Sequence, residues 1–403
     1  MSNLQGKHIV LGVTGSIAAF KAADLASKLT QLGTQVDVIL TPSAEKFITP
    51  LTLQSVTGRK AYTEADLWGS EAYVLHVGLA KSADLIVIAP CTANTLAKLA
   101  HGEADTLLTI TALAANCPLL IAPAMDGGMF DHPATQENLS KLKERGAYIA
   151  GPAEGHLASG LSGIGRLLEV PELIGYVRFV LGSSGRLVGK KVVVSAGGTQ
   201  EPLDPVRVLT NKSSGKQGYA LAQAAIDAGA QVALITAPTS LTPPVGAKVI
   251  NVQTAKQMLD AVLKESADAD ALIMAAAVAD FRPKQVAGNK LKKRDGIPQL
   301  EFEATEDILE AAKDLKSRAK RPCITVGFAA ESRDLLENAN EKLKSKDLDL
   351  IVANDIASKE AGFGVDTNRV TLLFSSGKQE SLPLMSKAEV AETILERIAA
   401  LLE

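Results

Sequence analysis

Apolar strand patterns alternate with amphipathic helical patterns along almost the whole chain, and this alternation occurs twice. The strand patterns of the first half are KHIVLGVTG, QVDVILT, DLIVIAP and PLLIAPAM, and those of the second half are KKVVVSAGG, QVALITAP, DALIMAAAV, CITVGFAA and LDLIVAND. Uniformly apolar strands bounded by Gly or Pro are typical of parallel sheets covered on both faces. The sequence therefore predicts an α/β protein with two tandem doubly wound Rossmann-like domains and mostly parallel sheets.

A short stretch rich in Gly and Ser, GSSGRLVG at 182–189, interrupts the alternation. We interpret it as a linker, so the predicted domains are residues 1–181 and 190–403. In the first domain, residues 17–32 and 133–145 have helical patterns. Ligands of doubly wound sheets bind at the carboxyl ends of the strands, so the segments that follow the strands are the candidate sites.

Composition excludes several classes of function. The net charge of −3 gives no broad positive field for nucleic acid or an anionic membrane, and only 4% of residues are aromatic. The apolar run at 271–279 fits a buried strand and is too short to cross a bilayer. Cys91, Cys117 and Cys323 lack metal-ligand spacing. We expect a cytoplasmic enzyme that acts on small molecules, with no nucleic-acid or membrane partner.

Three strand ends of the first domain carry polar residues, in GVTGSIAAFK (12–21), APCTANT (89–95) and APAMDGGM (122–129). Hydroxyls and helix amides at neighbouring strand ends suit a ligand the size of a mononucleotide. The dinucleotide pattern Gly-x-Gly-x-x-Gly is absent, and the first stretch taken alone is equally compatible with an ordinary turn. Further on, the Gly-rich segment 155–167 lacks the apolar periodicity of a helix or strand and is predicted to be a mobile loop. Such a loop could serve as a flap over a binding site.

The second domain has a long connection after its first strand, ending in NKSSGKQG at 211–218. It is not the common P-loop, because Thr210 and Gln217 occupy the positions that require Gly and Ser or Thr. We predict a helix over 214–228, capped by Ser213 or Ser214, whose free amides favour phosphate. The basic run NKLKKR at 289–294 is either a solvated surface or part of a triphosphate site.

These motifs resemble two known enzyme families. GVTGSIAAFK, PCTANT and PAMDGGM resemble the signatures of FMN-dependent cysteine decarboxylases, and NKSSGK resembles the matching run of phosphopantothenate–cysteine ligases. Both resemblances, in this order, cover essentially the whole chain. The chain thus resembles the bifunctional phosphopantothenoylcysteine decarboxylase/phosphopantothenate–cysteine ligases of coenzyme A biosynthesis. The resemblance implies a flavodoxin-like FMN domain followed by a ligase domain, and a homo-oligomer with flavin sites shared between subunits.

For the first domain, the resemblance implies decarboxylation to 4′-phosphopantetheine with His76 as the catalytic base. The implied FMN-binding residues are Gly15, Ser16, Thr41, Pro90, Thr92, Asn94, Thr95 and Met125. The family has Asn where this chain has Asp126, and a proton-donating Cys where it has Ser159. A hydroxyl is a much weaker acid than a thiol, so Asp126 is a candidate helper in the final protonation.

For the second domain, the resemblance implies ligation of 4′-phosphopantothenate with L-cysteine through an acyl-cytidylate formed from CTP with Mg²⁺, whose ligands stay unassigned. Asn211 and Lys290 are the implied catalytic residues. The residues implied in binding CTP and phosphopantothenate are Arg207, Ser213, Ser214, Gly215, Lys216, Asp280, Lys290, Glu306, Asp307, Ile308, Leu309, Phe328, Lys342 and Lys346. The stretch TEDI at 305–308 replaces the family's usual Asn-Pro-Asp-Ile.

Two alternatives remain open at this point. The first is an active ligase fused to a flavin domain that binds and assembles but decarboxylates poorly, which Asp126 and Ser159 would explain. The second is a nicotinamide oxidoreductase, which the missing dinucleotide patterns disfavour.

Overall fold

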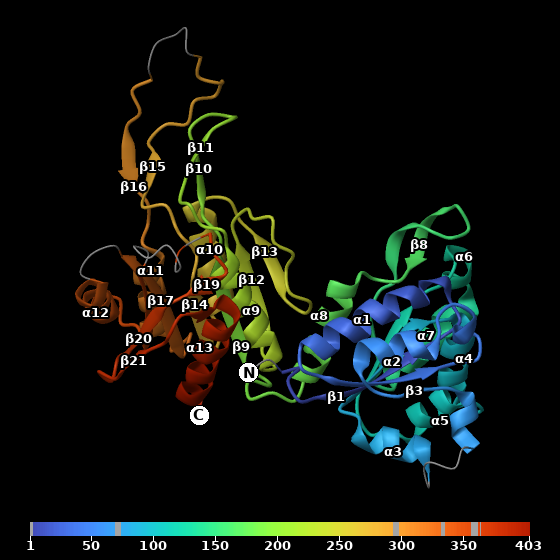
Figure 1. The fold of residues 1–403 in the computed structure, drawn as a ribbon. Helices are drawn as coiled ribbons and strands as arrows, with labels where there is room; N and C mark the ends of the chain where they lie inside the picture. Colours follow the sequence, from blue (N-terminus) through green and yellow to red (C-terminus); the bar gives the residue numbers. More distant parts are fainter. Residues whose placement is uncertain (1–2, 69–73, 293–297, 332–334, 356–361, 363) are drawn as a thin grey trace. The chain divides into compact units, whose positions relative to one another are not determined.

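The computed structural model describes residues 3–68, 74–292, 298–331, 335–355, 362 and 364–403. The described chain divides into two compact units, residues 3–181 and residues 182–403 (Figure 1). None of the helices within the described ranges is both long enough and apolar enough to cross a membrane.

The N-terminal unit is built on a six-stranded parallel sheet in the order β3-β2-β1-β4-β5-β6. The strands are β1 (His8–Val13), β2 (Gln35–Leu40), β3 (Ala61–Tyr62), β4 (Leu85–Cys91), β5 (Leu119–Pro123) and β6 (Tyr148–Ile149). Without the two-residue edge strand β3, the order of the strands along the chain is 2-1-3-4-5, which is the flavodoxin-like order. The predicted parallel α/β fold is confirmed for this unit.

Helices cover both faces of this sheet because alternate strand residues point to opposite sides. In β1, Ile9 and Leu11 pack in the core beneath α1 and α8, whereas Val10 packs in the core beneath α4 and α5. The helices are α1 (Phe20–Gln31), α2 (Pro50–Thr57), α3 (Leu75–Ser82), α4 (Ala93–His101), α5 (Leu107–Ala114), α6 (Gly127–Phe130), α7 (Pro133–Glu144) and α8 (Val170–Gly182), with short 3-10 helices η1 (Ile17–Ala19), η2 (Ala44–Lys46) and η3 (Glu64–Trp68).

The Gly-rich segment at 155–167 was expected to be a loop without regular structure, and this prediction is wrong. Its ends pair as an antiparallel hairpin of β7 (Ala153–His156) and β8 (Ser162–Arg166). The two strands are held together by backbone hydrogen bonds. Strands of a hairpin can form these bonds without a buried apolar face, so no apolar periodicity is needed in the sequence. We call residues 153–166 the flap.

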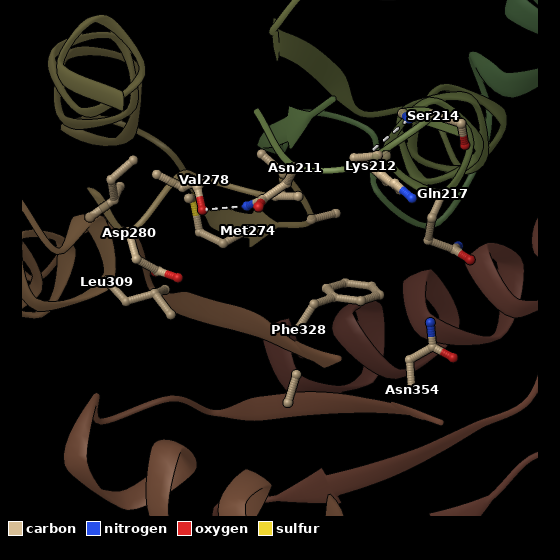
Figure 2. Close-up of a pocket in the computed structure, with 18 of the residues that line it drawn as sticks. Asn211, Lys212, Ser214, Gln217, Met274, Val278, Asp280, Leu309, Phe328 and Asn354 are labelled. Atoms are coloured by element: carbon tan, nitrogen blue, oxygen red, sulfur yellow. Dashed lines mark hydrogen bonds between the residues drawn. The ribbon is translucent and has the colours of Figure 1, made fainter. Parts of the chain in front are cut away.

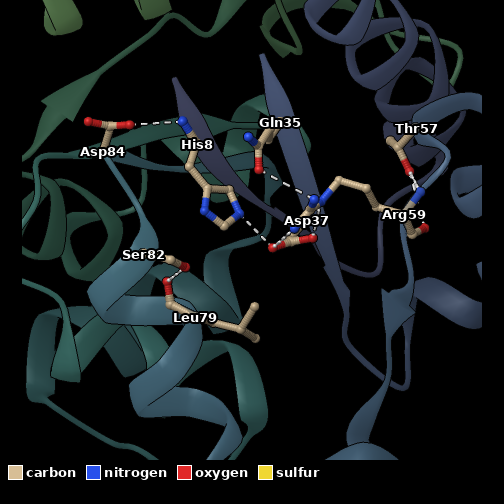
Figure 3. Close-up of polar contacts among 8 residues, drawn as sticks. All are labelled: His8, Gln35, Asp37, Thr57, Arg59, Leu79, Ser82 and Asp84. Atoms are coloured by element: carbon tan, nitrogen blue, oxygen red, sulfur yellow. Dashed lines mark hydrogen bonds and ion pairs between the residues drawn. The ribbon is translucent and has the colours of Figure 1, made fainter. Parts of the chain in front are cut away.

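A charged cluster, shown in Figure 3, lies near the amino-terminal ends of β1 and β2. The sequence motifs follow the opposite, carboxyl ends of the strands. His8 on β1 contacts the carboxylate of Asp37 on β2, with 2.5 Å between Nε2 and Oδ2. Arg59 donates to both carboxylate oxygens of Asp37, at 2.6 and 3.0 Å. Burial raises the pKa of Asp37, but the hydrogen bonds from His8 and Arg59 outweigh it and the net pKa is lowered. The cluster therefore favours the ionised carboxylate.

The C-terminal unit has an eight-stranded sheet in the order β13-β12-β9-β14-β17-β18-β20-β21, parallel from β13 to β18 and antiparallel beyond. The strands are β9 (Lys191–Ala196), β12 (Gln231–Thr236), β13 (Lys248–Asn251), β14 (Ala271–Met274), β17 (Ile324–Glu331), β18 (Leu350–Asp355), β20 (Val370–Phe374) and β21 (Gln379–Ser381). The strand predicted across 271–279 ends at Met274, because the chain leaves the sheet there to line a cavity.

Helices and small hairpins complete the C-terminal unit. The helices are α9 (Lys216–Asp227), α10 (Ala255–Ser266), α11 (Ile308–Ala319), α12 (Leu335–Ser345) and α13 (Lys387–Leu402). The two-stranded pairs are β10 (Gln200–Pro202) with β11 (Val208–Thr210), β15 (Phe281–Pro283) with β16 (Phe302–Ala304), and β19 (Thr367–Asn368) with β22 (Met385–Ser386). The first two pairs extend away from the body of this unit (Figure 1).

The segment predicted as a linker packs against the C-terminal unit. Leu187 is buried, and its N–H donates to the carbonyl of Ala228 at the end of α9. Gly185 lies so close to the same carbonyl that a side-chain carbon there would come within 2.3 Å of it. The connection is therefore anchored at its C-terminal half by close backbone packing.

Candidate functional site

A cavity of about 490 Å³ opens at the carboxyl ends of the central strands of the C-terminal unit (Figure 2). It lies where the strand order reverses between β9 and β14, which is the usual ligand position in doubly wound sheets. The residues predicted for this domain that line it are Asn211, Ser213, Ser214, Gly215, Lys216, Asp280, Glu306, Asp307, Ile308, Leu309, Phe328 and Lys342. The structure thus brings together residues from five separate segments of the chain.

The N-terminus of α9 faces this cavity, but its cap differs from the prediction. Gly215, not Ser213 or Ser214, is the N-cap residue, with φ of 76° and no side-chain cap hydrogen bond. The predicted serine cap is wrong because the chain enters α9 through a left-handed turn that glycine adopts without strain. Lys216, Gln217 and Gly218 of the first turn line the cavity. With no capping side chain, the amides of this turn are available to an anion.

Asn211 is held at the rim of the cavity by one hydrogen bond. Its Nδ2 donates to the carbonyl of Val278 at 2.9 Å, as Figure 2 shows. Val278 belongs to the segment that follows β14, so this contact joins two walls of the cavity. The bond fixes the side-chain amide and leaves Oδ1 as an acceptor.

The opposite wall is formed by Phe328 and the start of α11. Lys342 on α12 donates to the carbonyl of Phe328 at 3.0 Å. Asp307 caps α11 by accepting from the N–H of Glu310, and Lys346 pairs with Asp307 at 2.9 Å. Burial raises the pKa of Asp307, but the hydrogen bond from Lys346 helps to make the net shift downward. Lys346 therefore supports the wall of the cavity through Asp307 and is not among its lining residues.

Arg207 and Lys290 lie outside this cavity in the single chain. Arg207 follows the turn between β10 and β11 and donates to the carbonyl of Leu291, the neighbour of Lys290. Asp204 accepts from the N–H groups of Arg207 and Leu291, so the two projecting segments are tied to one another. Lys293 and Arg294 of the predicted basic run lie outside the described residues.

Several cavity residues were missed by the sequence interpretation. Lys387, the first residue of α13, is buried, and its Nζ donates to the carbonyls of Gly362 at 2.9 Å and Val365 at 2.6 Å. Burial, and secondly repulsion from Lys216, lowers the pKa of Lys387. Asn354 at the end of β18 is also buried, and its Oδ1 has no hydrogen-bond partner in the described structure. A polar residue at a strand end was the available signal for Asn354, whereas nothing local marked Lys387.

In the N-terminal unit, the predicted flavin residues lie at or just beyond the carboxyl ends of strands, with Pro90 near the end of β4 itself and the others after β1, β2, β4 or β5. Thr14, one residue beyond β1, donates to the carbonyl of Pro90 at 2.7 Å and accepts from the N–H of Thr92 at 3.0 Å. Thr92 caps α4 by accepting from the N–H of Thr95. Ser16 likewise caps the 3-10 helix after β1. The ends of β1 and β4 are thereby joined into one polar surface.

The other predicted residues extend this surface. Thr41 directly follows β2, and its N–H donates to the carbonyl of Val13 in β1. Asn94 is exposed in the first turn of α4, and Met125 follows β5. Gly15 lies tightly against Ser43, since a side-chain carbon at Gly15 would be 2.3 Å from the Cβ of Ser43. Polar caps and helix amides of this kind suit the phosphate of a mononucleotide.

Asp126 and Ser159 meet directly. The hydroxyl of Ser159, on the flap between β7 and β8, donates to Oδ2 of Asp126 at 2.8 Å. Oδ1 of Asp126 accepts from the N–H of Gly128 at 3.0 Å and so caps α6. The structure therefore joins the two positions of the N-terminal unit at which this chain departs from the decarboxylase motifs.

His76 lies apart from this pair. It is the second residue of α3, a helix that packs against α5. Figure 1 shows α3 and β8 on opposite sides of the N-terminal unit. One chain by itself therefore does not bring His76 to the flap.

The two halves of the chain match two protein families. Residues 1–181 match the family described as Flavoprotein, and residues 187–402 match the one described as DNA/pantothenate metabolism flavoprotein C-terminal domain. The Bacillus subtilis (strain 168) coenzyme A biosynthesis bifunctional protein CoaBC is 48% identical over 401 residues, covering 99% of this chain and 98% of the relative. The chain belongs to the CoaBC family.

Other CoaBC proteins match with similar coverage. The Mycobacterium tuberculosis (strain ATCC 25618 / H37Rv) protein of that name is 43% identical over 408 residues, covering 98% of this chain and 97% of its own. A solved C-terminal domain of CoaBC is 39% identical, covers 54% of this chain and 98% of its own, and has a TM-score of 0.47. The family assignment rests on the full-length relatives. Because they are named as bifunctional, neither the assembly-domain alternative nor the nicotinamide alternative finds support.

The described part of this CoaBC chain contains no preformed metal site made of protein side chains alone. Among those residues, no group of three or more His, Cys, Asp or Glu side chains could hold a metal ion. Mg²⁺ commonly binds through one or two carboxylates together with substrate phosphates. Asp280, Glu306 and Asp307 are the acidic residues of the C-terminal cavity, so any ion there would depend on the substrate for its remaining ligands.

Proposed function

We propose that this chain catalyses two consecutive reactions of coenzyme A biosynthesis. The C-terminal domain would join 4′-phosphopantothenate to L-cysteine at the expense of CTP, and the N-terminal domain, binding FMN, would decarboxylate the product to 4′-phosphopantetheine. The observation that carries this proposal is the 48% identity to a CoaBC protein over essentially the whole length of both chains. The cavity at the strand-order reversal of the C-terminal sheet supports the proposal that the first reaction takes place there.

In the ligation, a carboxylate must first be given a leaving group. Attack of the pantothenate carboxylate on the α-phosphorus of CTP forms a C–O–P anhydride and releases pyrophosphate. Attack of the cysteine amine on the acyl carbon then forms the amide, releases CMP and frees a proton. The open amides of α9 and Lys216 would bind phosphate, and Lys342 lies on the opposite wall. Mg²⁺, held mainly by the triphosphate, would offset its charge.

Asn211 would position the acyl-cytidylate. Its Nδ2 is committed to the carbonyl of Val278, so its Oδ1 would serve the substrate as a neutral acceptor. A neutral side chain binds beside an anionic intermediate without charge repulsion. Lys290 and Arg207 would act from the projecting segments. To contact the triphosphate, these segments would have to lie over the opening of a C-terminal cavity.

In the decarboxylation, Ser16, Thr41, Thr92 and the first turn of α4 would hold the flavin phosphate. These hydroxyl and amide donors fit an anionic mononucleotide. When bound, FMN supplies the redox chemistry that makes loss of CO₂ possible. His76 would accept a proton from the substrate, and the flap would exclude water from the site.

The separation of α3 from the flap supports a homo-oligomer with shared flavin sites. If His76 and the flap act on one substrate, they must come from different copies of the chain. Large apolar side chains near the strand ends, including Phe20, Phe47 and Leu51, are exposed and would be covered by such contacts. We further propose a cytoplasmic location, where phosphorylated substrates that cannot cross membranes are made and used.

The test is mass spectrometry of products formed from phosphopantothenate, cysteine and a nucleotide. With CTP we expect phosphopantothenoylcysteine, CMP and pyrophosphate first, and then 4′-phosphopantetheine and CO₂. ATP in place of CTP tests the nucleotide, and EDTA tests the need for Mg²⁺. Failure to form any amide product with either nucleotide would overturn the ligase assignment. Formation of the amide without CO₂, in protein that carries flavin, would overturn the decarboxylase assignment.

A further inference from the structure

The flap lies tightly against the segment that follows β5. The N–H of Met125 donates to the carbonyl of Gly165 at 3.0 Å. Gly165 has a φ of 139°, and a side-chain carbon there would come within 2.2 Å of the carbonyl oxygen of Met125. A side-chain carbon at Gly127 would lie 3.0 Å from the carbonyl oxygen of Ile164, which is a tight contact. At Gly165, the two backbones therefore approach at a spacing that only glycine permits.

Near its tip, the flap makes one side-chain bond to this segment, between Ser159 and Asp126. The two residues are 33 positions apart in sequence, and the hydroxyl donates to the carboxylate at 2.8 Å. The second carboxylate oxygen is occupied by the N–H of Gly128. Both oxygens of Asp126 thus act as acceptors, and the hydroxyl hydrogen of Ser159 is already committed. A group that supplies a proton to a substrate must instead carry a hydrogen that points at the substrate.

We propose that Asp126 and Ser159 form a latch that holds the flap closed, and that both are positioning residues rather than proton donors. The idea rests on the decarboxylase function proposed above and assigns a role within that site. A hydroxyl that donates to an ionised carboxylate makes a stronger bond than a hydroxyl that donates to a neutral amide. A thiol is a weak donor. The two departures from the decarboxylase motifs therefore compensate for one another, because together they create one hydroxyl–carboxylate hydrogen bond.

Hydrogen exchange tests the latch directly, without substrate or turnover. The Met125 amide is protected only while the flap lies against the segment that follows β5, so its exchange reports opening. In the full-length protein, Ser159→Ala and Asp126→Ala should each speed exchange of this amide roughly tenfold, the worth of one such hydrogen bond. Because Asp126→Ala also removes the cap of α6, the double variant should be no faster than Asp126→Ala alone. Ser162→Ala, on the same hairpin and outside the pair, is the matched control and should leave exchange unchanged.

Conservative variants separate a latch from an acid. Asp126→Asn and Ser159→Thr keep an acceptor and a hydroxyl, so both should retain most of the protection and most of the rate of 4′-phosphopantetheine formation. Asp126→Ala and Ser159→Ala should lower that rate equally and raise KM for phosphopantothenoylcysteine, with no additional loss in the double variant. If Asp126 were the proton donor, Asp126→Asn would be as impaired as Asp126→Ala. If Ser159 were the donor, Ser159→Ala would be far worse than either Asp126 variant.

Several outcomes would overturn the latch. They are additive effects of the two alanine substitutions, unchanged exchange at Met125, or an Asp126→Asn enzyme that accumulates the unreduced enethiol product. Gly165→Ala provides an independent check, since a side chain there clashes with the Met125 carbonyl and should open the flap in the presence of an intact pair. A wild-type protein that releases no CO₂ would contradict the proposed function but leave the exchange results interpretable, so the two failures can be told apart.

Discussion

The two α/β units arrange their central strands in the same way, yet they differ in what one chain can complete. The orders β2-β1-β4-β5 and β12-β9-β14-β17 are equivalent, and in both units the motifs follow the carboxyl ends of these strands. In the C-terminal unit, several separate segments of one chain enclose a cavity of about 490 Å³. In the N-terminal unit, Figure 1 shows α3, which carries His76, and strand β8 of the flap on opposite sides. A shared topology fixes where a site lies, but the loops decide whether a single chain closes it.

The largest expected effect concerns the unit whose site is divided. His76→Asn should lower CO₂ release at least about 100-fold, because an imidazole can accept a proton at neutral pH and an amide cannot. Flavin binding and CTP consumption should be unchanged. The measurement is CO₂ release beside flavin absorbance and pyrophosphate release. Loss of flavin together with CO₂ release would instead make His76 a structural residue.

Oligomers made of two different variants test whether the N-terminal site is shared between copies of the chain. A His76→Asn chain supplies an intact flap, and a Gly165→Ala chain supplies an intact His76. If the site is shared between copies and Gly165→Ala lowers CO₂ release by opening the flap, co-assembly of the two impaired chains should restore part of the CO₂ release. No recovery after proven co-assembly would argue for a site within one chain.

Asn211→Asp should lower ligation by about 100-fold in the C-terminal unit, where one chain encloses the cavity. The new carboxylate cannot donate to the carbonyl of Val278, and its charge would repel the anionic intermediate. Decarboxylation of supplied phosphopantothenoylcysteine should be unaffected. Lys212→Gln, at the neighbouring cavity position, is the control. An Asn211→Asp enzyme with normal amide formation would remove Asn211 from the proposed mechanism.

Asp37→Asn should lower the free energy of unfolding of the N-terminal unit by about 2–3 kcal/mol. This is a small value for the loss of a buried ion pair, because the Arg59 side chain stays in contact with water. The folded-state pKa of Asp37 is lowered, so its contribution is complete above the ordinary value near ~3.9 and is lost as the pH falls below that value. Thermal unfolding from pH 6 to pH 3 measures this. Equal acid sensitivity of wild type and variant in that window would contradict the assignment.

The smallest effect is expected at Lys387. Lys387→Met removes the ammonium that holds the carbonyls of Gly362 and Val365, so KM for CTP should rise about fivefold while kcat changes little. Lys387→Arg keeps donors and a charge and should recover part of the loss. Lys378→Met, on the exposed turn after β20, is the control. An unchanged KM would leave Lys387 with a purely structural role.

The sequence predicted the parts of the fold that depend on local patterns. Buried strands such as β1, β4 and β9 were recognisable because uniformly apolar runs bounded by Gly or Pro have few other solutions in a soluble protein. The cap of α9 was misassigned because serine is the commoner N-cap, whereas Gly215 is selected by a positive φ that only the folded backbone reveals. The flap hairpin was missed because its strands are short and half-exposed.

Sequence alone determined the double α/β order, the strand ends that carry polar motifs and the positions at which the chain departs from its family, since each depends on neighbours along the chain. Tertiary structure decided which distant residues meet. The hydroxyl of Ser159 finds Asp126 across 33 residues, and Gln217 of α9 donates to the carbonyl of Lys387 across 170. Such contacts follow from the packing of loops at the edge of a sheet, where no periodic pattern specifies a partner and a hydrogen bond forms with whichever group the backbone brings within reach.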